Sequence, residues 1–431
     1  MPLHLQCIST VYLCISIVYP YISTLYKIRL TTVNTICNIT IMQYKTIMLI
    51  AGELSGDIHG SNLMRNLKNL DNSLKFIGAG SKRMKQEGLA GITDMEKLAV
   101  VGFKEVFEKL QGLKKTFRLL SQTLVREKPD CLILIDYPGF NLRMAKVAKE
   151  HNIPVFYYIS PQVWAWGGNR IKKIKKYVDK LFVILPFETE FYSKHGIRAH
   201  FVGHPLLDIV KTSMTKEDAF SYFDFKADKI LIGTLPGSRW EEVKLSMPVI
   251  FDACATISKQ VPNAQFGILV SENIDIKQLE NLLSRKRLSS RTNVNLRLIR
   301  EKSYDFINIC DLILVNSGTA TLEIAILGKP MIIIYKLSLI TWLLARMLVR
   351  ISYFGLANIL AGKKIVPELF QFGATPSAIA KESLHILADE SKIRAIQKEL
   401  SEVKTKLGQP GASERTAKAI LEELGRKVNN G

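Results

Sequence analysis

Cysteine is scarce in this sequence, and its spacing matches no metal or disulfide framework. Six cysteines are scattered through 431 residues, with no CxxC pair and no Cys/His cluster at zinc-site spacing. A disulfide-stapled domain is therefore excluded, and a reducing compartment without a structural metal is indicated. With 47% hydrophobic and 23% charged residues, the chain is neither collagenous nor disordered. A chain of this length is expected to form two or three globular domains.

Acidic residues are too few to balance the basic ones. The chain carries 59 Lys and Arg against 39 Asp and Glu, which gives a formal net charge of +20. An excess of this size predicts an anionic partner, and nucleic acid, an anionic membrane surface and phosphorylated substrates all fit. Charge alone does not choose among them. The sequence also contains no DxD pair that could hold a divalent metal.

Charged residues are absent from the first 26 positions. A membrane anchor needs about 20 apolar residues, but this segment is interrupted by hydroxyl side chains and by Pro20. A secretory signal is disfavoured because no basic n-region or small-residue cleavage site is visible. We favour a third interpretation, in which Met42 is the true start, because the first βα unit follows it directly. Residues 1–41 are therefore treated as an atypical extension, untranslated or disordered.

After Met42, short apolar runs alternate with helical patterns. Strands are expected at 46–51, 131–136, 155–159, 180–185, 229–235, 265–270, 294–299, 312–315 and 331–335. This rhythm predicts an α/β protein with two doubly wound, Rossmann-like parallel sheets that face each other across a cleft. The expected division is 42–205, 206–365 and a helical tail at 366–431. Ligands in such folds bind beyond the carboxyl ends of the strands.

Two motifs follow strands of the first sheet. AGELSGDIHG (51–60) is neither GxGxxG, GxxxxGK[ST] nor GxSxG, but its glycines allow a tight turn, and Ser55 or Asp57 could cap the next helix. The alternative is that both residues are caps only. In IDYPGFN (135–141), Asp136 ends an apolar strand and could serve as a general base. Its alternative role is to cap the helix expected at 141–151.

A third motif combines aromatic and basic residues. Trp164 and Trp166 are followed by Arg170 and by four lysines within the next six positions. Nucleic acid and an anionic membrane could both use an aromatic ledge beside a basic helix. An ordinary solvated basic face is the competing interpretation.

Two motifs follow strands of the second sheet. LPGSR (235–239) offers Gly237, Ser238 and the permanent cation of Arg239. NSGTATLE (316–323) leads into a helix whose first amides suit a pyrophosphate, and Glu323 could accept hydrogen bonds from both ribose hydroxyls. Together they predict a nucleotide diphosphate held by backbone dipoles and arginine.

The ordered motifs resemble the lipid-A-disaccharide synthase family over essentially all of the chain after Met42. The set is AGELSGDIHG, IDYPGFN, SPQVWAW, LPFE (185–188), VGHPLLD (202–208), LPGSR, SGTATLE and ANILAGKKIVPELFQ (357–371). The resemblance implies a GT-B fold and an inverting, metal-independent, cofactor-free glycosyl transfer. It implies UDP-2,3-diacylglucosamine as donor, 2,3-diacylglucosamine 1-phosphate as acceptor, and a β-1,6 disaccharide 1-phosphate and UDP as products.

The resemblance also carries over residue roles. Asp136 matches the family's essential aspartate and Arg239 its essential arginine. Independently of the resemblance, His59 is a second-choice base, and the alternative is that it only packs or hydrogen-bonds locally. Gly139 stands where some members have Asp, which favours Asp136 as the base. The expected donor-site residues are Ser55, Gly237, Ser238, Arg239, Ser317, Gly318, Thr319, Glu323 and Asn358. The expected acceptor- or membrane-facing residues are Phe103, Phe107, Trp164, Trp166 and Arg170.

Acylated substrates imply a peripheral enzyme on the cytoplasmic face of an inner membrane. No nucleic-acid partner is expected, and the sequence does not decide between a monomer and a homodimer. In 100–124, Phe103 and Phe107 recur at helical spacing among lysines, and an interfacial helix or ordinary core packing would both explain them. The segment 340–360 is expected to be a buried or interfacial helix.

Two rival functions are a nucleotide-sugar epimerase, which shares the two-sheet architecture, and a non-catalytic nucleic-acid-binding protein.

Overall fold

The fold is taken from a computed structural model. It describes residues 45–52, 54–94, 103–164, 168–290, 294–338, 342–343 and 353–428. The predicted extension 1–41, most of 340–360, Trp166, and the side chains of Phe103 and Phe107 lie outside the described residues.

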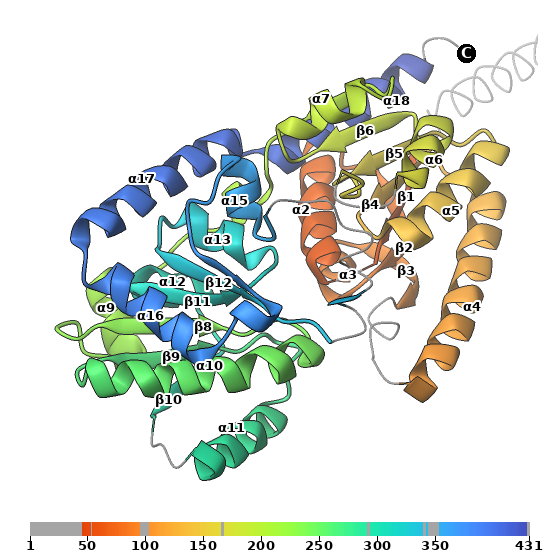
Figure 1. The fold of residues 1–431 in the computed structure, drawn as a ribbon. Helices are drawn as coiled ribbons and strands as arrows, with labels where there is room; N and C mark the ends of the chain where they lie inside the picture. The colour runs from red at the N-terminus through yellow and green to blue at the C-terminus, as the bar shows by residue number, and fades with distance from the viewer. Residues whose placement is uncertain are drawn as a thin grey trace, which may run out of the picture. The chain divides into compact units, whose positions relative to one another are not determined.

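The first sheet has seven parallel strands in the order β3-β2-β1-β4-β5-β6-β7 (Figure 1). Its strands are β1 (Thr46–Ala51), β2 (Lys75–Gly80), β3 (Leu89–Asp94), β4 (Cys131–Ile135), β5 (Val155–Tyr158), β6 (Lys180–Val183) and β7 (Ala199–Phe201). The central strands β4 and β5 are buried along their whole length because helices cover both faces, as their continuous apolar sequence requires. The helices of this half are α2 (Leu54–Leu70), α3 (Lys82–Gln86), α4 (Phe103–Glu127), α5 (Pro138–Glu150), α6 (Asn169–Tyr177) and α7 (Phe187–Ser193).

The second sheet has six parallel strands in the order β10-β9-β8-β11-β12-β13. Its strands are β8 (Leu231–Leu235), β9 (Gln265–Leu269), β10 (Leu296–Ile299), β11 (Leu312–Asn316), β12 (Met331–Tyr335) and β13 (Glu368–Phe370). The helices from the end of the first sheet onward are α8 (Leu206–Ile209), α9 (Lys216–Tyr222), α10 (Trp240–Gln260), α11 (Ile276–Ser290), α12 (Ser303–Ile309), α13 (Ala320–Ile326) and α15 (Leu356–Ala361). All the strands expected from the sequence are present.

The tail forms α16 (Pro376–Leu387), α17 (Glu390–Lys406) and α18 (Ala412–Val428). Helix α16 packs on α10, and α17 packs on α13 and α15, whereas α18 packs on α2 (Figure 1). The last described helix therefore packs against the part of the structure that contains the first sheet.

The VGHPLLD motif (202–208) forms hydrogen bonds with the C-terminal segment between α17 and α18 and with the start of α18. Arg415 donates hydrogen bonds from Nε and Nη2 to the Val202 carbonyl, at 2.9 and 2.7 Å. The Asp208 carboxylate accepts from the Gly411 amide at 2.6 Å, and the His204 amide donates to the Leu407 carbonyl. Gly203 has φ +82, and a Cβ there would lie 2.6 Å from the Arg415 guanidinium, so only glycine fits this crossing. The motif therefore has a structural role that its sequence did not reveal.

No helix among the described residues is both long enough and apolar enough to span a bilayer.

Candidate functional site

The first predicted site residue sits on a strained corner after β4. Asp136 and Tyr137 both have left-handed backbone conformations, with φ of 47° and 46°. Side chains disfavour this region, and two such residues in succession are typical of functional turns. Helix α5 begins at Pro138 with Tyr137 as its N-cap residue, so Asp136 does not occupy the cap position that was the alternative. Asp136 is half-buried at the carboxyl end of the sheet.

Gly52, which directly follows β1, packs against this corner. A Cβ added to Gly52 would lie 2.3 Å from Cγ of Tyr137, which leaves no room for any other residue. At Gly139, by contrast, a Cβ would meet nothing within 4 Å. The first glycine of the motif therefore serves close contact between two loops at the sheet edge.

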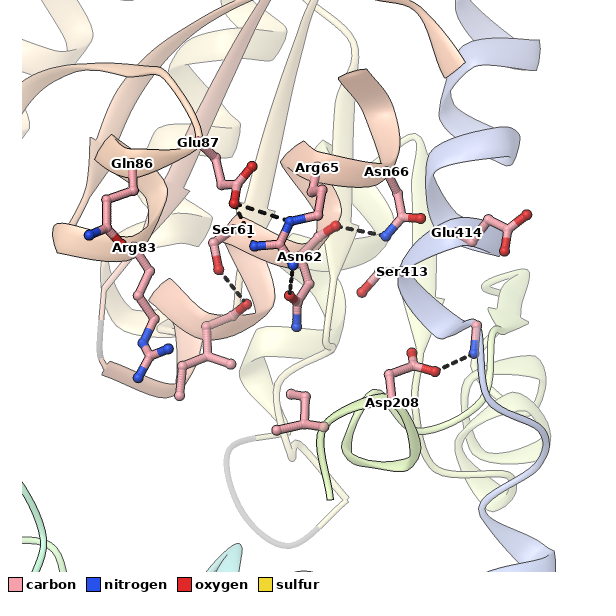
Figure 2. Close-up of a pocket in the computed structure, with 13 residues that line it drawn as sticks. Ser61, Asn62, Arg65, Asn66, Arg83, Gln86, Glu87, Asp208, Ser413 and Glu414 are labelled. Atoms are coloured by element: carbon pink, nitrogen blue, oxygen red, sulfur yellow. Dashed lines mark hydrogen bonds and ion pairs between the residues drawn. The ribbon is translucent and has the colours of Figure 1, made fainter. Parts of the chain in front are cut away.

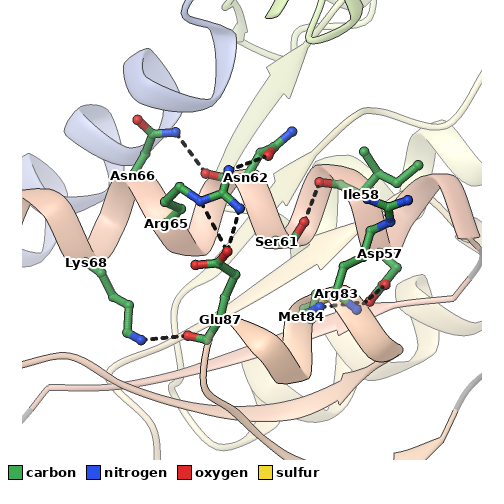
Figure 3. Close-up of polar contacts among 10 residues, drawn as sticks. All are labelled: Asp57, Ile58, Ser61, Asn62, Arg65, Asn66, Lys68, Arg83, Met84 and Glu87. Carbon is green, nitrogen blue, oxygen red and sulfur yellow. Dashed lines mark hydrogen bonds and ion pairs between the residues drawn. The ribbon is translucent and has the colours of Figure 1, made fainter. Parts of the chain in front are cut away.

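Asp57 caps a helix, but not the one expected. Its buried carboxylate accepts hydrogen bonds from the amides of Ser81, Arg83 and Met84, at 2.6, 2.9 and 3.3 Å. Figure 3 shows Asp57 beside Arg83 and Met84. These amides belong to the first turn of α3, whereas Asp57 itself lies inside α2. The expectation of a cap on α2 was wrong for this residue, because a carboxylate in the first turn of one helix can reach the next across a tight packing contact. Ser55 is half-buried in the first turn of α2.

Helix α3 is also held at its other end. Arg65 donates to the Glu87 carboxylate from Nε and Nη2, at 3.1 and 2.5 Å, and Lys68 donates to the Glu87 carbonyl at 2.7 Å (Figure 3). Together with Asp57, these contacts clamp α3 onto α2.

A hydrophilic cavity of about 520 Å³ lies beside this clamp, and Figure 2 shows its lining. It is bounded by α2, α3, α8 and the start of α18, and none of the predicted site residues lines it. Each charged side chain of the lining already has a partner. Arg65 pairs with Glu87 and Asp208 accepts from the Gly411 amide, while Arg83 and Glu414 pair with Glu272 and Lys418, which lie outside the lining. The lining therefore singles out no ligand. Sequence reasoning missed the cavity because four distant segments build it.

His59 is enclosed. Its side chain is 8% exposed, and Nδ1 has no hydrogen-bond partner in the described part of the chain. Burial lowers its pKa to about 4, so the ring is neutral at neutral pH. Burial, and then the neighbouring His59, lowers the pKa of His204 to about 3. These properties favour local packing over a role as general base.

In the second half, the LPGSR turn presents an exposed cation. Glu242 reaches back to accept hydrogen bonds from the amides of Ser238 and Arg239, at 3.1 and 3.4 Å, and so fixes the start of α10. The Arg239 side chain is 62% exposed, with its guanidinium 3.6 Å from the Glu242 carboxylate. Gly237 has φ +135, and a Cβ there would lie 2.7 Å from that of Glu242. The turn thus requires glycine and leaves the guanidinium accessible.

The NSGTATLE turn lies against LPGSR. The Cβ position of Gly237 is 3.4 Å from Nδ2 of Asn316, so the structure brings the two predicted nucleotide loops together. Ser317 donates to the Phe354 carbonyl at 2.9 Å. Gly318 and Thr319 are exposed at the start of α13, where a Cβ on Gly318 would meet nothing within 4 Å. Within the described residues, no three His, Cys, Asp or Glu side chains gather as a metal site would require.

Glu323 lies one turn into α13 and hydrogen-bonds with Tyr304. Burial raises its pKa to about 7, although the Tyr304 hydroxyl partly opposes this rise. A substantial fraction of Glu323 is therefore protonated near neutral pH in the ligand-free protein.

This raised pKa gives the ribose assignment a test. Ribose hydroxyls donate to an ionised carboxylate, so UDP binding should lower the pKa of Glu323, and affinity should fall as pH drops below about 7. The expected fall is up to about tenfold per pH unit. Calorimetric titration of wild type and Glu323→Gln with UDP would measure it. The phosphate of UDP titrates alike in both proteins, so a ratio of affinities that does not vary with pH would contradict the assignment.

Asn358 is enclosed by protein groups. It is 0% exposed, and its Nδ2 donates to the Val366 carbonyl and the Glu368 carboxylate, at 3.0 and 2.8 Å. Its Oδ1 accepts from the amides of Ile365 and Val366. Both ends of the amide are used within the protein, so the expected direct contact of Asn358 with nucleotide stays a prediction that these hydrogen bonds do not support. Glu368 in turn accepts from the amides of Phe354 and Gly355, next to Ser317.

The aromatic and basic motif is partly internal. The Trp164 ring is half-buried and packs edge-on against Phe187, with centroids 5.1 Å apart, so it is not a free ledge. The preceding Ser160 donates to the buried Glu188 carboxylate at 2.7 Å, which links SPQVW to LPFE. Burial raises the pKa of Glu188 to about 7. Arg170 is half-buried on α6, whereas the lysines that follow it are exposed.

Residues 47–423 match the family described as lipid-A-disaccharide synthetase. The lipid-A-disaccharide synthase of Geobacter sulfurreducens is 40% identical over 382 residues, which cover 89% of this chain and 98% of that protein.

Solved structures resemble the fold at lower identity. The UDP-GlcNAc 2-epimerase of Neisseria meningitidis bound to UDP-GlcNAc has a TM-score of 0.61 at 14% identity, covering 88% of this chain and all of that one. The glycotransferase of kitacinnamycin has a TM-score of 0.57 at 13% identity, covering 89% and 100% of the two chains. The expected GT-B fold class is confirmed. With the family match spanning most of its length, the chain belongs to the lipid-A-disaccharide synthase family.

Proposed function

We propose that the protein transfers 2,3-diacylglucosamine from UDP to 2,3-diacylglucosamine 1-phosphate, giving a β-1,6-linked disaccharide 1-phosphate and UDP. The observation that carries this proposal is the family match over 47–423. It is supported by the positions of Asp136 and Arg239, which follow the strands β4 and β8 of two parallel sheets.

The proposed chemistry is an inverting displacement without a metal. Asp136 accepts the proton of the acceptor hydroxyl as that oxygen bonds to the anomeric carbon. The bond from this carbon to the UDP oxygen breaks, and UDP leaves with the electron pair. Arg239 and the amides of the exposed residues Gly318 and Thr319 stabilise the negative charge on the departing diphosphate. The two sheets would then supply base and donor site from opposite walls of a cleft.

A direct experiment tests the function. Purified protein is incubated with both lipid substrates, and the products are analysed by mass spectrometry. A disaccharide 1-phosphate together with free UDP is expected. An epimerase, whose fold is shared, would instead return a UDP-sugar of unchanged mass, and neither product would form from a non-catalytic nucleic-acid-binding protein.

We further propose that the enzyme acts peripherally at the cytoplasmic face of an inner membrane. Helices α4, α5 and α6 pack in sequence over one face of the first sheet. The exposed basic residues described on these helices are Lys114, Lys115, Arg118, Arg126, Arg143, Lys146, Lys172, Lys173, Lys175 and Lys176. Anionic headgroups attract such a layer by about 1 kcal/mol per basic residue near the surface.

Phe103 and Phe107 at the start of α4 are expected to add apolar contact with the bilayer. Phe103→Glu combined with Phe107→Glu should release the protein from anionic vesicles in a sedimentation assay, because two rings proposed to contact the bilayer would be replaced by negative charges. Lipid turnover should fall more than UDP affinity. Leu288→Glu, at a residue 80% exposed on α11, is the control. Unchanged sedimentation of the double variant would move the contact to α6.

A further inference from the structure

We propose that Tyr157 and Asn141 are positioning residues, which orient the Asp136 carboxylate by holding its backbone carbonyl. This inference rests on the proposed role of Asp136 as base. The Tyr157 hydroxyl donates to the Asp136 carbonyl oxygen at 2.5 Å, and Asn141 Nδ2 donates to the same oxygen at 2.7 Å. Asn141 Nδ2 also donates to the Ile135 carbonyl at 3.1 Å.

The two donors come from different elements. Tyr157 lies on β5, the strand next to β4, and Asn141 lies in the first turn of α5. Both side chains are 0% exposed, so water does not compete for these hydrogen bonds. Two directional contacts on one oxygen, from a strand and from a helix, fix the plane of the peptide between Asp136 and Tyr137.

The conformation held in this way is one that side chains disfavour. Asp136 and Tyr137 would relax toward ordinary backbone angles without an opposing interaction. Such a relaxation would rotate the Cα–Cβ bond of Asp136 and displace its carboxylate. A base must lie within hydrogen-bond reach of the proton it removes, and a displacement of about 1 Å can cost about a hundredfold in rate.

The carboxylate and the phenol are also electrostatically linked. Burial, and then the negative charge of Asp136, raise the pKa of Tyr157 well above its ordinary value. The hydroxyl therefore stays protonated, and available as a donor, throughout the pH range in which the enzyme would work.

The chain offers a matched pair of variants at neighbouring positions. Tyr158 is also on β5 and 0% exposed, but its hydroxyl contacts Ser413 at 3.3 Å instead of the Asp136 corner. Tyr157→Phe and Tyr158→Phe thus each remove one buried hydroxyl. We expect Tyr157→Phe to lower kcat roughly tenfold at unchanged KM for the UDP-sugar, as the loss of one hydrogen bond allows. Tyr158→Phe should leave kcat near wild type with a similar change in Tm.

A double-mutant cycle separates positioning from general destabilisation. In an Asp136→Asn background there is no base to orient, so Tyr157→Phe should have little further effect on residual turnover. The same fold-loss in both backgrounds, or wild-type kcat in Tyr157→Phe, would overturn the inference. Asn141→Leu, which deletes the second donor, should reproduce the loss of kcat if it folds. If Asp136→Asn itself keeps wild-type kcat, the proposed role of Asp136 as base is wrong, and this inference fails with it. If Asp136→Asn loses turnover but Tyr157→Phe does not, only this inference fails.

Discussion

Asp136→Asn is expected to lower turnover by roughly 10²–10⁴-fold, the range that general base catalysis contributes, while the protein stays folded. The amide matches the shape of the carboxylate but cannot take the acceptor's proton. The carbonyl contacts from Tyr157 and Asn141 involve the backbone and are retained, so the corner should keep its conformation. UDP affinity should be unchanged because the proposed nucleotide loops belong to the other sheet. Product formation by mass spectrometry and UDP binding by calorimetry measure both.

The competing base provides the control. His59 is 8% exposed and has a pKa of about 4, so it is a weak base and a poorly accessible one. His59→Gln should reduce stability through altered packing and leave the turnover of the folded fraction near wild type. The assignment of Asp136 would be refuted if folded Asp136→Asn kept near wild-type kcat while His59→Gln lost it.

The central strands of both sheets could be predicted because each is a continuous apolar run. Four strands could not: β2, β3, β7 and β13. Strands β3, β7 and β13 lie at sheet edges, and β2 and β3 contain glycine, so none of them shows a long run of β-branched residues. Edge position and close backbone approach come from neighbours in space, which periodicity along the chain does not record.

The same contrast between patterns along the chain and contacts in space applies to the candidate site residues. The positions of Asp136 and Arg239 beyond the carboxyl ends of β4 and β8 were predictable, because each follows an apolar strand; their roles in catalysis stay predictions. The contacts of Asn358, Asp57 and His204 could not be predicted. Asn358 and Asp57 bind backbone groups of neighbouring segments, and His204 binds the carbonyl of Leu407, far away in the sequence. The sequence alone does not distinguish a buried polar residue that binds a ligand from one that supports a ligand-binding loop. Only the full set of hydrogen-bond partners of Asn358 separates the two cases.

Arg239→Ala is expected to weaken UDP binding by roughly 10–150-fold and to slow transfer, since a charge-assisted hydrogen bond is worth about 1.5–3 kcal/mol. The loss of its contact with Glu242 should matter little, because the Arg239 side chain is 62% exposed and its guanidinium lies 3.6 Å from the Glu242 carboxylate. Arg239→Lys should recover only part of the affinity, because an ammonium group lacks the planar fork that matches a diphosphate. Calorimetric titration with UDP measures all three proteins, and Arg285→Ala, at an exposed position on α11, is the matched control.

The same experiment tests metal independence. If arginine and backbone amides carry the charge of the leaving diphosphate, EDTA should change neither UDP affinity nor turnover in wild type. Arg239→Ala then removes the main cation, and added Mg²⁺ should restore neither UDP affinity nor turnover. Strong inhibition by EDTA, or rescue of Arg239→Ala by Mg²⁺ to wild-type turnover, would show that a metal shares this role. UDP affinity in Arg239→Ala equal to that of Arg285→Ala would instead place the diphosphate away from the LPGSR turn.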